Sequence, residues 1–235
     1  MGGAGAVNSS ATLTGSRVEI VDWRARHDGT KVSQHRGRVL ERDPRDVDSV
    51  TLHQTACVFG PASDREKRLA RAMKIGAHAT AFREGVGVLA MPLRWQGIHA
   101  NALNATSIGL EIEGLYAGLQ DDPTTAPRED LRTTWGRPPL ELTELVVETA
   151  RALLTRIVEL AAAEGIELRY VRAHRQASGA RRSDPGEGLW RAVALEHAVA
   201  RLGLRVEPDR TWVSKSSGEG RPIPEAWGGG AGVQY

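Results

Sequence analysis

The chain has 235 residues, and its 31 basic and 29 acidic side chains leave a formal net charge of +2. This near balance argues against a protein that binds nucleic acid through charge alone. A single cysteine, Cys57, excludes both an intramolecular disulfide framework and a cysteine-rich zinc finger.

The two ends of the chain differ in composition from the middle. Residues 1–16 are small, polar and without periodicity, and residues 214–235 are rich in Gly, Ser and Pro. These compositions predict a flexible N-terminal segment and a C-terminal tail on either side of one domain over residues 17–213. The chain has no run of 18 apolar residues, and its start lacks the basic and apolar regions of a signal peptide. We therefore expect no membrane insertion, and synthesis in the cytoplasm without a classical signal peptide.

Strands and helices alternate between these two ends. Alternating apolar and polar residues predict strands over 17–23 and 49–55. A helix is expected to begin at Ser63, because its spacing to Glu66 is that of a capping box, and to end at Gly76. The remaining predicted elements are a hairpin over 78–93, a strand over 105–114, a long loop over 115–139, a helix from Thr143 to Gly165, a strand over 167–173 and a final helix over 187–203. This order predicts an α/β fold with a mixed central β-sheet flanked by helices.

Side chains able to bind a metal occupy corresponding places on three of the predicted strands. His53 and Glu111 lie on the polar faces of their strands, His174 follows the end of a third strand, and Asp184 comes ten residues later. If these strands are neighbours in the sheet, the four side chains meet above one surface. Two imidazoles and a carboxylate suit Zn²⁺ and leave a fourth position for water. Spacing alone leaves open a different interpretation, in which the histidines are structural and the sequence "SDPG" forms a solvated turn.

Four motifs together resemble a known family. "VTLHQTA", "GAHATAFRE", "NATSIGLEIEG" and "RAHRQASGARRSDPG" occur here in the order and approximate separations found in zinc-dependent N-acetylmuramoyl-L-alanine amidases of the type 2 family, relatives of the peptidoglycan recognition proteins. The resemblance covers roughly residues 47–200. It implies an amidase-like or peptidoglycan-recognition-protein-like fold. It also implies hydrolysis of the amide bond between N-acetylmuramic acid and L-alanine in peptidoglycan or muropeptides.

The resemblance also implies a role for individual residues. His53, His174 and Asp184 correspond to the zinc ligands, and Glu111 corresponds to the general base that takes a proton from the attacking water. Arg182 stands where such amidases usually carry Lys, and it can stabilise an oxyanion although it is a poor proton donor. A solvated basic rim is the alternative for Arg182.

Three further residues lie in segments similar to those of the family. We predict that His99 contacts substrate, that Trp95 borders the substrate groove, and that His78 supports the site from behind. Each has a simpler alternative, because buried histidines often serve only as hydrogen-bonded structural residues and tryptophans as core residues.

The alternative function is a non-catalytic recognition module of the same fold that binds peptidoglycan. The complete set of predicted ligands favours the enzyme, although ligands alone do not exclude a metal hydrolase that acts on another amide. We expect a monomer with peptidoglycan or muropeptide as its substrate and no nucleic-acid partner. A phage lysin or effector released to the cell wall and a recycling enzyme for soluble muropeptides both remain open.

Overall fold

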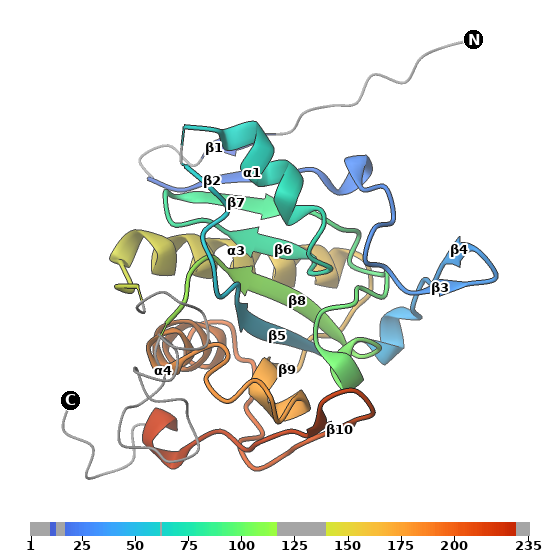
Figure 1. Ribbon diagram of the computed structural model, residues 1–235, viewed down its shortest axis with the longest axis vertical. Helices are drawn as coiled ribbons and strands as arrows, with labels where there is room; N and C mark the ends of the chain where they lie inside the picture. The colour runs from blue at the N-terminus through green and yellow to red at the C-terminus, as the bar shows by residue number, and fades with distance from the viewer. Residues whose placement is uncertain (1–9, 13–16, 62, 117–139, 229–235) are drawn as a thin grey trace.

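The computed structural model describes residues 10–12, 17–61, 63–116 and 140–228 (Figure 1). Its centre is a seven-stranded sheet with the order β1-β2-β7-β6-β8-β5-β9. The β1/β2 and β6/β7 pairs are antiparallel, and the other neighbouring pairs are parallel. These strands are β1 (Ser10–Thr12), β2 (Glu19–Asp22), β5 (Ser49–Gln54), β6 (Ala79–Ala81), β7 (Val86–Leu89), β8 (Ser107–Ile112) and β9 (Tyr170–Ala173). The predicted α/β fold with a mixed sheet is confirmed, as is the β6/β7 hairpin.

The parallel strands β8, β5 and β9 lie side by side and end at the same edge of the sheet (Figure 1). His53 of β5 is the register partner of Glu111 of β8. On the other side of β5, Leu52 pairs with Ala173 of β9, so His174 follows directly beyond that edge. The carboxyl ends of neighbouring parallel strands are where α/β sheets commonly build their sites.

The helices begin where local capping signals place them. In α3 (Glu144–Ala163), the Thr143 side chain accepts the Val146 N–H at 3.5 Å, as predicted. In α1 (Arg65–Ala72), the cap is Asp64, whose carboxylate accepts the Lys67 N–H at 3.3 Å. The prediction of Ser63 as the cap was therefore wrong by one residue. An aspartate at this position also places negative charge at the positive end of the helix dipole. The last helix begins as α4 (Glu187–Leu189) and continues as the π-helical segment η5 (Trp190–Val199).

The sheet has a hydrophobic core on each face because its strands alternate inward and outward residues. Leu52 of β5 and Leu110 of β8 pack in the large core with α3 and η5. On the opposite face, Leu69 of α1 packs with Phe82 and Val88 in a smaller core. His53 and Glu111 follow Leu52 and Leu110 by one residue each, so they project from the face that carries α1.

Part of each predicted end segment is structured. At the N-terminus, β1 pairs with β2. At the C-terminus, the hairpin of β10 (Val213–Ser214) and β11 (Gly218–Glu219) leads to the short helix η6 (Glu225–Gly228), and Trp227 is completely buried. Residues 214–228 thus pack against the body, although their composition predicted a tail. The loop predicted over 115–139 lies mostly outside the described residues.

Among the described residues, no helix is long and apolar enough to cross a membrane.

The remaining elements are short and lie outside the seven-stranded sheet. The short elements are β3 (Gln34–His35), β4 (Arg38–Val39), and the 3₁₀ helices η1 (Arg24–Arg26), η2 (Pro44–Asp46), η3 (Asn101–Leu103) and η4 (His174–Ala177).

Candidate metal centre

Three buried side chains converge at the carboxyl ends of β5 and β9. One ligand atom from each of His53, His174 and Asp184 lies within 4.8 Å of the others. His53 Nδ1 lies 3.0 Å from His174 Nδ1, and His174 Nδ1 lies 2.9 Å from Asp184 Oδ2. Ligands held about 2.0–2.2 Å from a tetrahedral zinc lie roughly 3.3 Å apart, so these separations are close to those a zinc site requires. The residues present therefore fit a zinc ion.

Gln54 holds the loop that carries Asp184, and sequence reasoning missed it. Its backbone N–H donates to Asp184 Oδ1 at 2.9 Å, and its side-chain amide donates to the Ser183 carbonyl at 2.8 Å. The backbone N–H of Tyr116 donates to the Gln54 side-chain oxygen. Because Asp184 Oδ1 is occupied in this way, Oδ2 is the oxygen that faces the histidines. The position of Gln54 directly after His53 was the only signal, and it points to no particular role.

Burial shifts the pKa values of two groups at the site, one in each direction. Burial lowers the pKa of His53 well below 6.5, helped by repulsion from His174, so the ring is in the neutral form that binds metals. Burial raises the pKa of Glu111 to about 8; the Asp184 carboxylate adds to this rise and Arg181 opposes it.

Glu111 lies beside the three candidate ligands. Its Oε1 is 3.9 Å from His53 Nδ1. Its Oε2 is buried and makes no hydrogen bond within the part of the chain that the structure describes. Burying a carboxylate oxygen in this way is costly unless a ligand uses it. The Glu111 carboxyl is thus positioned to exchange a proton with a molecule at the candidate metal site.

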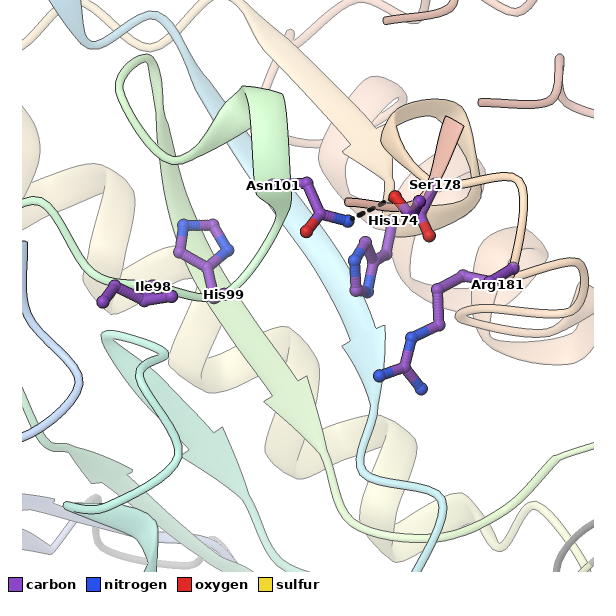
Figure 2. A pocket seen from close by; sticks show the side chains of 8 residues that line it. Ile98, His99, Asn101, His174, Ser178 and Arg181 are labelled. Carbon is purple, nitrogen blue, oxygen red and sulfur yellow. Dashed lines mark hydrogen bonds between the residues drawn. The ribbon is translucent and has the colours of Figure 1, made fainter. Parts of the chain in front are cut away.

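A pocket of about 420 Å³ opens next to His174 (Figure 2). Figure 2 shows the Arg181 side chain extending into it near His174. Arg182 is not among the residues that line this pocket; it is half-buried, and its backbone carbonyl accepts a hydrogen bond from the Arg175 guanidinium. The pocket is lined by Ile98, His99, Asn101, His174, Ser178, Ala180, Arg181 and Ser217.

The three further residues predicted for the site occupy different places. His99 lines the pocket, and its Nδ1 lies 3.0 Å from Nε2 of His53. His78 is completely buried behind His99, and its Nδ1 accepts the Gly109 N–H at 2.9 Å. Trp95 is half-buried against the His27 ring and is not part of the pocket lining.

The sequence matches the family model Amidase_2, described as N-acetylmuramoyl-L-alanine amidase, over residues 43–187, which is more than half of the chain. The chain belongs to this amidase family. The matched region contains His53, Glu111, His174 and Asp184, and the family resemblance predicted from the four motifs is confirmed.

Several solved structures are similar to this member of the amidase family. The endolysin amidase LysCS from Clostridium intestinale is 15% identical, with a TM-score of 0.44, over 79% of this chain and 96% of that one. Drosophila PGRP-LB is 12% identical, with a TM-score of 0.45, over 79% and 95%. The ectodomain complex of the peptidoglycan recognition proteins LCa and LCx with bound tracheal cytotoxin is 16% identical, with a TM-score of 0.48, over 76% and 96%. No curated protein matches the sequence.

Proposed function

We propose that this protein is a zinc-dependent amidase that hydrolyses the bond between N-acetylmuramic acid and L-alanine in peptidoglycan or muropeptides. The observation that carries the proposal is the convergence of His53, His174 and Asp184 beside Glu111, whose buried Oε2 has no hydrogen-bond partner among the described residues. A structural ion pair or a satisfied core histidine requires no such carboxyl oxygen. Membership of the amidase family supports the reaction class.

Each residue of the site has a distinct task in this proposal. His53, His174 and Asp184 would hold zinc, which when bound polarises the amide carbonyl and lowers the pKa of water. Glu111 takes a proton from the attacking water and passes it to the leaving amine of L-alanine. A guanidinium in the pocket stabilises the negative charge that develops on the amide oxygen, and Arg181 is the arginine placed there.

The experiment is digestion of purified cell wall by the zinc-loaded protein, with mass analysis of the released fragments. We expect free stem peptides that begin with L-alanine, and their loss after treatment with a chelator and in the His53→Ala variant. Release at another bond would identify a different amidohydrolase. Binding to the cell wall without any release would identify a recognition module. Intact sacculi and soluble muropeptides, assayed in parallel, would show which form is the substrate.

A further inference from the structure

We propose that His99 is a positioning residue that fixes the tautomer and the orientation of the metal ligand His53. In this arrangement, His53 presents the lone pair of Nδ1 to the metal while its Nε2–H is held by His99. The inference rests on the proposed zinc site and adds to it a residue that contacts no zinc. No role of His99 in substrate contact is needed for it.

The direction of the hydrogen bonds follows from one backbone carbonyl. His99 Nε2 lies 3.3 Å from the Ser107 carbonyl oxygen, which can only accept, so the proton of the neutral ring is on Nε2. His99 Nδ1 is then an acceptor. It lies 3.0 Å from His53 Nε2, which must therefore carry a proton and donate it. A neutral imidazole has only one N–H, so His53 Nδ1 bears a free lone pair.

That lone pair is located where the metal would bind. His53 Nδ1 is the ring atom that lies 3.0 Å from His174 Nδ1 and 3.9 Å from Glu111 Oε1. Histidines that bind metals usually donate their second ring N–H to a carboxylate, a carbonyl or water, which sets the tautomer and raises the basicity of the ligand. Here a second imidazole provides the acceptor, and the Ser107 carbonyl in turn orients that imidazole.

The surroundings of His99 fix its ring in place. Gly109, in the middle of β8, lies directly beneath it, and a Cβ at this position would come within 2.7 Å of the ring atoms. The glycine of the "SIGLE" motif is thus needed for the ring to lie against the strand. The His99 ring also makes edge contacts with His53, at a centroid distance of 5.2 Å, and with His78, at 5.5 Å. A ring that only touched substrate would need none of these constraints.

Two amide variants of His99 separate positioning from other roles. In His99→Asn the side-chain oxygen can take the place of Nδ1, whereas in His99→Gln the amide reaches the place of Nε2 and leaves His53 without its acceptor. We expect His99→Gln to weaken zinc binding by about 10- to 100-fold, measured by competition with a chromophoric chelator, and His99→Asn to restore most of it. The visible spectrum of the cobalt-substituted protein should shift in His99→Gln and stay close to wild type in His99→Asn. His35→Asn, at an exposed histidine of β3, is the matched control and should leave both readouts unchanged.

A measurement on the wild-type protein tests the same idea without any variant. In the zinc-loaded protein labelled with ¹⁵N-histidine, His53 should carry its proton on Nε2 and bind zinc through Nδ1. The opposite tautomer, or zinc affinity and cobalt spectra that are the same in wild type and His99→Gln, would overturn the role of His99 while leaving the zinc site intact. A wild-type protein that binds no zinc would instead overturn the proposed function itself.

Discussion

Glu111 and Glu113 project from the same face of the sheet, two residues apart, and yet their surroundings differ completely. Glu111 Oε2 makes no hydrogen bond with the described residues, and burial raises the pKa of this carboxyl to about 8. The Glu113 carboxylate accepts the backbone N–H of Phe59 at 2.8 Å and of Arg83 at 3.2 Å, and it pairs with Arg68. Strand alternation predicted the shared face, whereas the partners of each carboxylate depend on α1 and on the loops around it.

The Glu111→Gln variant separates catalysis from stability. Because the amide cannot take a proton from water, we expect the turnover number to fall by about 100- to 10,000-fold. Because burial raises the pKa of Glu111 to about 8 and so favours its neutral form, replacing it with a neutral amide should not lower the free energy of unfolding. Stem-peptide release and urea denaturation measure the two quantities. A variant of normal activity would exclude Glu111 as the general base.

The two neighbouring arginines of the 178–184 loop are distinguished by their positions. Arg181 lines the pocket and Arg182 is not part of its lining. We expect Arg181→Ala to lower the turnover number by about 100-fold, because it removes a charge that stabilises the oxyanion, and Arg182→Ala to have a small effect. Steady-state kinetics of the paired variants decides between them. The reverse order of effects would support the role that the family resemblance implied for Arg182.

At the scale of elements, a buried ion pair joins α1 to the end of β8. Arg68 of α1 is 3% exposed and Glu113 is fully buried, with 2.5 Å between the guanidinium and the carboxylate. Arg68 also contacts the carboxylate of Glu84 at 2.8 Å. The pair anchors the helix that covers the sheet face next to the site.

Glu113→Gln should therefore destabilise the fold, in contrast to Glu111→Gln on the same strand. Loss of the carboxylate leaves the buried guanidinium with Glu84 as its remaining counter-charge among the described residues, and we expect a cost of about 3 kcal/mol in the free energy of unfolding. Urea denaturation of the two variants, side by side, provides the comparison. Equal free energies of unfolding for Glu113→Gln and Glu111→Gln would show that Glu84 alone suffices to neutralise Arg68. At saturating zinc and below its melting temperature, the folded fraction of Glu113→Gln should remain active.

At the scale of the whole molecule, the C-terminal segment supports the loop that carries Asp184. The Arg221 N–H donates to the Arg175 carbonyl at 2.8 Å, and the Arg175 N–H donates to the Asp184 carbonyl at 3.1 Å. The Arg175 guanidinium lies 5.1 Å from the centre of the Trp227 ring. Residues between 214 and 228 thus support the loop that carries Asp184, although their composition is that of a tail.

Truncating the anchor of this segment tests its contribution. Trp227 is completely buried in the core that contains α3 and η5, so Trp227→Ala should cost about 3–5 kcal/mol. Val213→Ala is the control, because Val213 is 73% exposed and its truncation should leave stability unchanged. Thermal and urea unfolding measure both. A Trp227→Ala protein as stable as wild type would mean that the segment is only loosely attached.

The sequence by itself determined the alternation of strands and helices and the polar faces of the strands, because periodicity and capping act over a few residues. The residues of the candidate metal centre came from the resemblance of four motifs to the amidase family. The sequence did not identify Gln54 as the residue that holds Asp184, nor Arg181 as the arginine in the pocket, because neighbours in sequence can point in different directions. Composition predicted a tail over residues 214–235, since Gly, Ser and Pro content reports local flexibility, whereas the burial of Trp227 is a property of the tertiary structure.

Only the tertiary structure decided that β8, β5 and β9 are parallel neighbours, and hence that His53, Glu111 and His174 meet at one edge of the sheet. The order of the strands depends on how helices such as α3 and η5 pack against the sheet. Local sequence patterns do not reveal which strands become neighbours when they lie more than a hundred residues apart. The hydrogen-bond chain from Ser107 through His99 to His53 also depends on the tertiary structure, because it forms only where three separate segments of the chain come together.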